Sequence, residues 1–528
     1  MTEKRSKGLH LHNRLKHINI NNDHDFSALF VVNTPITDNS GIAHCVEHLI
    51  FRASKAFPHA TTLFQLTALT NVKINASTLA DTTYFHCQSP CLESFNLALN
   101  YLLNGIFAPL FCQEDLNKEI HDGNNCGVIY RELIGLKSQV EQQDKQLIDE
   151  NSSQADNSYN YSGDSQLIGQ LSLSDLQNFH QQHYQANNIT LVTANADIEQ
   201  VSILISQLPT QQKPLQIKNH LANANDKTKK RSHRNTHQNP QENISTQKKI
   251  SSTTDDKQQK KYSPEINELI AVYYQYLQDI YHQAPYYQGI DDYSEFKKPV
   301  KLIFEPKVLK QTDKLKSSIE SGLIAPLITL SKTLEKKSLN YRGMNNKIIK
   351  NEAVTIPKEP ESKHVLPRLF NKLYFKAKAQ LSNSLLDKNL AYVYDQHNAL
   401  LLVNIDKTTQ KSIHIMSYII NAYPRFLASR CQGLCYATQA LVIEALTIED
   451  SSYLAIYSAF DSTPTIRLKT IIQSLLQLSQ DTGFIQESLL LAKIKYCRTY
   501  QVEIHNLNGV TPLSISTTLL TLTSKASP

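Results

Sequence analysis

Apolar and polar positions follow regular spacings over most of the first 210 residues. Short apolar or alternating runs predict strands at 28–32, 73–79, 82–87 and 189–194. Apolar positions at helical spacing predict helices at 62–70, 94–105, 114–134 and 198–208. Because helices and strands interleave, we expect an α+β fold in which helices pack on mainly antiparallel sheets.

The spacing is lost after about residue 210. Residues 223–261 are rich in Lys, Asn, Gln, Ser and Thr and nearly free of large apolar side chains, so burial cannot offset the entropy of ordering them. The pattern returns in a hairpin at 392–405, a strand at 453–458 and a helix at 466–478. We therefore predict four regions, namely an N-terminal domain at 1–210, a linker at 211–262, a helical middle region at 263–370 and an α+β domain at 371–528.

The composition argues against a membrane or a nucleic acid as the partner of this protein. The chain has 528 residues, 41% of them hydrophobic, and a net charge of +6. Apolar runs stay well short of the ~20 residues that a membrane helix needs, so we expect no membrane partner. The basic run at 227–231 lacks interleaved aromatic residues, which makes nucleic acid an unlikely partner. The first 15 residues are polar, and none of the eight cysteines forms C-x-x-C, so we expect reduced thiols in a cytoplasmic protein.

The residues most suggestive of chemistry are His44-Cys45-Val46-Glu47-His48. On a helix, side chains four residues apart lie on one face, so His44 and His48 can bind the same metal ion. Glu47 is close enough to reach a water molecule on that metal. A catalytic zinc usually takes three protein ligands and keeps one position for water, so a third ligand is expected from elsewhere in the chain.

Residues 37–48 resemble the active-site helix of the pitrilysin/insulinase-type metallopeptidases, which carry this inverted H-x-x-E-H motif, and most closely the presequence-protease branch. Residues 127–135 are similar to the segment that carries that family's third zinc ligand, which implies Glu132 in that role. Residues 74–78 resemble the family's substrate-binding edge strand, which implies that Asn75 and Ala76 bind the substrate backbone. Residues 159–163 and 173–184 resemble the signature that closes the first half of the metal domain.

The resemblance extends more weakly to the far end of the chain. The family completes its active site with an Arg and a Tyr from the C-terminal half, and the spacing of Arg430, Gly433 and Tyr436 matches that pattern. The chain departs from the family at Ala53 and Leu434, where glycines are usual, and it has roughly half the length of a full presequence-type protease. The second half of this chain therefore resembles a contracted version of the second half of a presequence-type protease.

The resemblance implies a fold of repeated α/β sandwich domains, with the zinc-binding catalytic domain at 1–210. It also implies a zinc-dependent endopeptidase with one Zn²⁺ per chain, held by His44, His48 and Glu132. Glu47 would act as general base, Arg430 and Tyr436 would donate hydrogen bonds to the reacting peptide, and the substrates would be short unfolded peptides. Two alternatives stay open. The chain could be a peptide-binding or scaffold homologue with little activity, or a half-enzyme that needs a partner subunit or a homo-oligomer.

Overall fold

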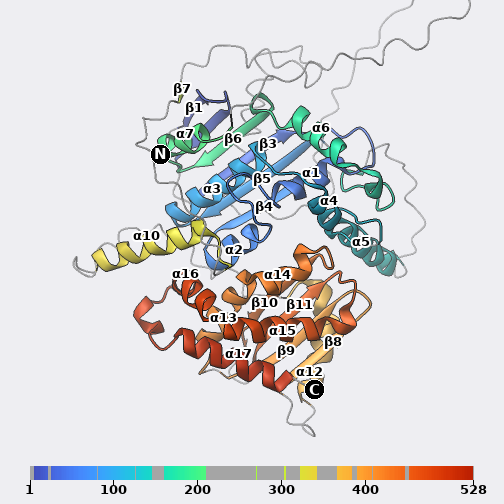
Figure 1. The fold of residues 1–528 in the computed structure, drawn as a ribbon, viewed down its shortest axis with the longest axis vertical. Coiled ribbons are helices and arrows are strands. Elements are labelled where there is room, and N and C mark those ends of the chain that lie inside the picture. Colours follow the sequence, from blue (N-terminus) through green and yellow to red (C-terminus); the bar gives the residue numbers. More distant parts are fainter. Residues whose placement is uncertain are drawn as a thin grey trace, which may run out of the picture.

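The computed structural model describes twelve stretches of the chain and shows two sheets, each covered by helices (Figure 1). The described residues are 5–21, 25–79, 81–124, 126–144, 160–209, 269, 303–304, 322–341, 366–382, 389–406, 408–445 and 451–526. The predicted linker at 211–262 and the basic run at 227–231 lie outside them.

The first sheet has seven strands in the order β4-β5-β3-β6-β2-β1-β7. Its strands are β1 (Arg5–His10), β2 (Lys16–Ile20), β3 (Phe26–Asn33), β4 (Lys73–Thr78), β5 (Thr82–Ser89), β6 (Ile189–Ala194) and β7 (Ile303–Phe304). Neighbours are antiparallel except for the β2–β6 and β1–β7 pairs. Strand β3 is buried on both faces because Phe30 faces the main core and Leu29 faces a smaller cluster behind the sheet.

Helices of the N-terminal half join the main core on one face of this sheet. They are α1 (Ile42–Ile50), α2 (Thr62–Leu69), α3 (Leu92–Phe107), α4 (Gln113–Glu119), α5 (Val128–Asp144), α6 (Leu173–His183) and α7 (Ile198–Ser206). Helix α3 contacts β3 and β5, and α1 contacts the edge strand β4. The motif helix therefore lies beside the one edge strand of this sheet that the resemblance assigns to substrate.

The second sheet has the order β10-β11-β9-β8 and is wholly antiparallel. Its strands are β8 (Leu390–Tyr394), β9 (Ala399–Ile405), β10 (Ala437–Ile443) and β11 (Ser452–Ala459). Its helices are α12 (Asn371–Ser382), α13 (Gln410–Ala422), α14 (Pro424–Cys431), α15 (Arg467–Gln480), α16 (Thr482–Tyr500) and α17 (Pro512–Ala526). Helix α12 packs on one face in a separate small core, and α13 and α15 contribute to the main core on the other.

The two halves share one hydrophobic core, which joins them through α2. Helix α2 packs against α13 and α16 of the C-terminal half (Figure 1). The buried Gln65 side chain donates to the carbonyl oxygens of Gly322 (2.8 Å) and Ala422 (3.1 Å). Lys495 Nζ donates to the carbonyl of Thr67 (2.6 Å), near the C-terminal end of α2. The described residues of the two halves therefore pack against each other.

Most predicted elements are present, with two differences. The predicted helix at 114–134 is two helices, α4 and α5, because Gly123 (φ 85°) and Gly127 (φ 123°) adopt left-handed backbone conformations between them. The described part of the predicted helical middle contains α10 (Ala325–Tyr341) but also β7, which extends the first sheet. The substitution at Ala53 causes no strain, since its φ is not positive.

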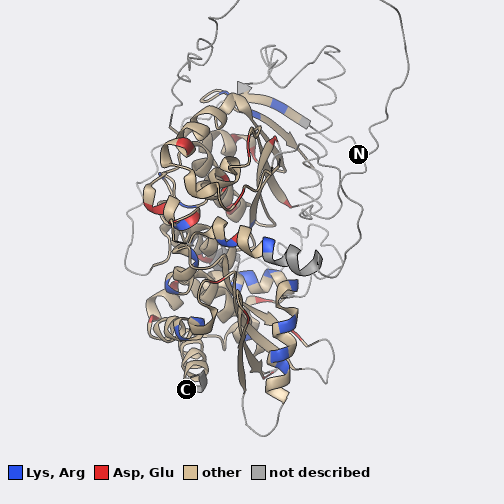
Figure 2. Ribbon diagram, turned by 90° about the vertical axis from the view of Figure 1, so that its right-hand side faces the viewer, with Lys and Arg blue, Asp and Glu red and all other residues tan. Residues whose placement is uncertain are grey.

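Charged residues are distributed over both halves in Figure 2. Lys and Arg occur on several separate elements, α12 among them, together with scattered Asp and Glu. Within the described residues, no helix combines the length and apolar character required to cross a membrane.

Candidate metal centre

The motif helix α1 begins at a close contact between two backbone segments. Gly41, which precedes the helix, has φ 71°, and a Cβ there would lie 2.6 Å from Gly163 Cα. Only glycine fits this approach without a shift of the backbone. The contact brings residues 160–163 against the start of α1, where Ser162 can reach His44. Ser40 Oγ accepts from the N–H of Ile42 (3.4 Å), so it contributes to the start of the helix although Gly41 is the capping residue.

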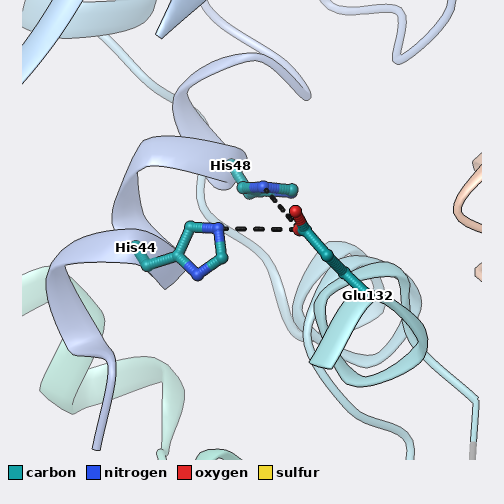
Figure 3. A group of neighbouring side chains, drawn as sticks. All are labelled: His44, His48 and Glu132. Atoms are coloured by element: carbon teal, nitrogen blue, oxygen red, sulfur yellow. Dashed lines mark ion pairs between the residues drawn. The ribbon is translucent and has the colours of Figure 1, made fainter. Parts of the chain in front are cut away.

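The two histidines and Glu132 converge on one point (Figure 3). Glu132 Oε2 lies 3.7 Å from His44 Nε2 and 3.9 Å from His48 Nε2. One ligand atom from each residue lies within 4.8 Å of the other two. The two histidines come from successive turns of α1, and Glu132 comes from the facing helix α5.

Hydrogen bonds on the far side of each ring fix the orientation of both histidines. His44 Nδ1 donates to the carbonyl oxygen of Ser162 (2.9 Å), and His48 Nδ1 donates to Glu119 Oε1 (3.0 Å). With the proton on Nδ1, each Nε2 presents a lone pair toward Glu132. Metal-binding histidines in proteins are commonly held by such a bond to a carbonyl or a carboxylate.

This donor set fits a divalent metal. Glu132 Oε2 is buried and has no hydrogen-bond partner, although two imidazole nitrogens face it. A buried carboxylate oxygen opposite two lone pairs is unfavourable without a cation between them. Two histidines and one glutamate are the ligands of a well-known class of catalytic zinc site, which leaves a fourth position open. The three residues could therefore hold Zn²⁺.

Glu47 lies next to the three candidate ligands and is held in one orientation. Its side chain is 6% exposed, and Thr78 Oγ1, at the end of edge strand β4, donates to Glu47 Oε2 (2.6 Å). The other carboxylate oxygen of Glu47 makes no hydrogen bond to Thr78. The edge strand thus orients the carboxylate that is expected to act as base.

Glu119 is a site residue that sequence reasoning missed. Its carboxylate is 2% exposed and accepts from His48, from Arg52 (3.3 Å) and twice from Arg430 (2.8 and 3.0 Å). Burial alone would raise the pKa of Glu119, but the charge of Arg430 and the bond from His48 outweigh it, so the pKa lies below its usual range. The local sequence gave no signal, because every residue of α4 except Leu116 is polar, as in a solvated helix.

Arg430 lies at the site, but it has a different partner from the one expected. Both terminal nitrogens of its guanidinium bind Glu119, so these donors are directed at the carboxylate that holds His48. Arg52, which also binds Glu119, donates to the carbonyl oxygen of Cys431 (3.1 Å), the residue that follows Arg430 in sequence. Arg430 is therefore linked to the candidate ligand His48 through Glu119.

Tyr436 lies beside the acidic residues of the site, as its predicted role requires. The negative charge of Glu132, together with burial, raises the pKa of Tyr436 above its usual range. The phenol therefore keeps its proton and can donate a hydrogen bond at neutral pH.

The predicted substrate strand is an edge strand. Strand β4 ends the first sheet and pairs only with β5 among the described strands. The N–H of Ala76 donates to the side chain of Asn75 (3.0 Å), and Ser77 Oγ donates to the carbonyl of Ala76 (2.7 Å). Side chains of the strand itself thus occupy backbone groups that a bound peptide would need.

Comparison with known proteins finds a family for the segment that carries the motif. The family model described as insulinase, peptidase family M16, matches residues 36–131. The match includes the whole motif and ends one residue before Glu132. These residues belong to the M16 family. The resemblance predicted from the motif is therefore confirmed.

Individual relatives are similar to parts of this chain. The mitochondrial presequence protease of Candida albicans is 27% identical over 202 residues, which are 35% of this chain and 19% of that protein. An uncharacterised protein of Schizosaccharomyces pombe is 26% identical over 169 residues, 31% of this chain and 16% of that protein. The matched segments thus amount to less than a fifth of either relative. The solved structure of pitrilysin aligns with 100% of this chain and 44% of its own, at 12% identity and a TM-score of 0.31.

Proposed function

We propose that this M16-family protein is a zinc-dependent endopeptidase that hydrolyses short, unfolded peptides. The observation that carries the proposal is the convergence of His44 Nε2 and His48 Nε2 on Glu132 Oε2, a buried oxygen with no hydrogen-bond partner. Bound zinc would polarise the scissile carbonyl and make a water molecule acidic near neutral pH. The side chains around the zinc site would transfer the proton and stabilise the developing negative charge.

Glu47 would accept the proton of the attacking water and return it to the leaving amine. The bond from Thr78 supports this role because it fixes one carboxylate oxygen and leaves the other to act as base. Tyr436, with its proton retained, would donate to the oxygen that becomes negatively charged as the peptide bond is attacked. Glu119 and its two arginines would hold His48 in its ligand orientation throughout.

The peptide would bind as an additional strand on β4. Pairing through backbone groups fixes the register of the substrate without requiring a particular sequence. The peptide would replace the bonds that Asn75 and Ser77 now make to Ala76. A chain in a folded protein cannot offer a free strand so readily, which supports unfolded peptides as substrates.

The proposal is tested by zinc content and by cleavage of a quenched fluorescent peptide, with Glu114→Gln as an exposed control. The wild type and the control should hold about one zinc per chain and cleave the peptide. Glu47→Gln should keep the zinc and lose the cleavage. A wild type that binds no zinc after reconstitution would refute the proposal. Zinc binding without cleavage, by the chain alone, would instead favour the peptide-binding homologue or the half-enzyme.

A further inference from the structure

The helix that carries Glu132 is held by the C-terminal half. The N–H of Gly127, just before α5, donates to the carbonyl of Gly433 (3.0 Å). One turn after Glu132, the ring of Phe460 lies against Gly135, so that a Cβ at Gly135 would be 2.2 Å from the ring. Residues three apart share a face of a helix, and the ring is therefore on the side of α5 from which Glu132 projects.

Phe460 has an unusual backbone conformation. It follows β11 with φ 47°, in the left-handed region that a bulky side chain rarely adopts. Its N–H donates to Asn398 Oδ1 (3.2 Å), and the next residue, Asp461, is fully buried in an ion pair with Arg467. The C-terminal half thus imposes this conformation by several bonds at once. Strain of this kind is found at functional sites more than elsewhere.

The same ring also contacts the predicted catalytic tyrosine. The centroids of Tyr436 and Phe460 are 5.8 Å apart. Phe460 therefore contacts both the helix of the third candidate ligand and Tyr436. A residue that served only to fill the core could occupy an unstrained position, whereas this contact requires both the ring and the absence of a side chain at Gly135.

We propose that Phe460 is a positioning residue that sets the place of α5, and with it the direction of Glu132, so that metal affinity depends on docking of the C-terminal half. The inference rests on the proposed zinc site. It assigns to the C-terminal half a part in building the metal centre, in addition to the residues it brings close to the substrate.

The test is the zinc affinity of the full chain, measured by competition with a chromophoric chelator. Phe460→Leu keeps an apolar side chain but removes the ring, and it should weaken zinc binding roughly 10- to 100-fold, as loss of groups that orient metal ligands commonly does. The matched control is Phe375→Leu on α12, where the side chain is 68% exposed, and its affinity should equal that of the wild type. Thermal unfolding of the metal-free proteins shows whether each variant folds.

A double-mutant cycle separates positioning from general loss of stability. If Phe460 acts through Glu132, then Phe460→Leu should cause no further loss of zinc affinity in a Glu132→Gln background. Should Phe460→Leu fail to fold, Gly135→Ala gives the same test, because Ala favours the helix but its Cβ would displace the ring or α5. That variant should bind zinc more weakly than the wild type.

Two results overturn the inference alone, namely wild-type zinc affinity in the folded variant, or the same loss in both backgrounds. A wild type that binds no zinc would overturn the proposed function together with the inference, so the two failures can be told apart.

Discussion

Replacement of Glu119 by Gln probes the network behind the metal centre. The carboxylate of Glu119 accepts bonds from four donors, namely His48 Nδ1, Arg52 Nη1 and both terminal nitrogens of Arg430. A glutamine has the same shape but only one accepting oxygen, and its NH₂ group would face donors. Glu119→Gln therefore removes the negative charge and sets donor against donor without creating a cavity.

Two effects of different size are expected. Loss of a carboxylate that orients a ligand histidine should weaken zinc binding roughly 10- to 100-fold, or about 1.4–2.8 kcal/mol. The fold should lose more, on the order of 3–5 kcal/mol, because Arg430 loses the carboxylate that compensates its charge, whereas Arg52 keeps its ion pair with Asp115 (2.8 Å). Glu119 is 2% exposed, so solvent screens little of this interaction.

The loss of unfolding free energy in Glu119→Gln should depend on pH in a defined direction. The pKa of Glu119 lies below its unfolded value, so its contribution to stability is present above about pH 4.3 and is lost as the pH falls through the folded pKa. The difference in unfolding free energy between the wild type and Glu119→Gln should thus be large at pH 7 and shrink in acid. Urea denaturation at several pH values measures it.

The matched control is Glu114→Gln on the same helix. Glu114 is 73% exposed and pairs with Lys118, so its replacement should change neither zinc affinity nor stability measurably. If Glu119→Gln bound zinc as tightly as the control and unfolded at the same urea concentration, the role assigned to the buried network would be wrong.

Two further predictions concern other parts of the N-terminal half. Thr78→Val removes the bond to Glu47 while keeping the shape, so kcat should fall roughly 10- to 100-fold with zinc affinity unchanged; equal kcat would contradict the orienting role. Burial lowers the pKa of His10 to about 3 and that of His17 well below its usual value, so both are neutral in the fold. Their contribution is present above the unfolded pKa of about 6.5 and lost below it, at about 1.4 kcal/mol per pH unit for each group. As the pH is lowered from 6.5 to 5.5, the urea concentration at the unfolding midpoint should decrease, and it should decrease less steeply in His10→Gln. Equal pH dependence of this midpoint in the wild type and in His10→Gln would contradict the prediction.

The elements around the motif could be predicted because local patterns determine them. Alternation and helical spacing identify the strands at 73–78 and 82–89 and the helix at 198–206. Strands β1 and β2 gave no such signal. Their buried polar side chains pair with each other, as in the bond between His10 and His17 (3.0 Å), or with β6, as in the bond between His17 and Thr193 (2.7 Å). Such residues look exposed in a sequence, since only the fold supplies their partners.

The candidate ligands could be found from sequence for a similar reason. His44 and His48 are one helical turn apart, so their juxtaposition needs no tertiary information. Glu132 needed the family pattern, and Glu119 could not be found, because its role depends on His48 and Arg430 meeting it in space. A motif can specify which residue types gather at a site, but it does not specify which atoms pair there.

Arg430 shows the consequence most clearly. The family resemblance implied that Arg430 and Tyr436 both donate to substrate, and the two do lie at the site. Yet a guanidinium binds a carboxylate through two parallel bonds, and Glu119 offers that partner within the protein. A substrate carbonyl offers a single weaker acceptor, so it would not compete for the same two donors. Of the pair, Tyr436 is therefore the residue expected to act on the peptide, and Arg430 the one expected to act on the metal centre.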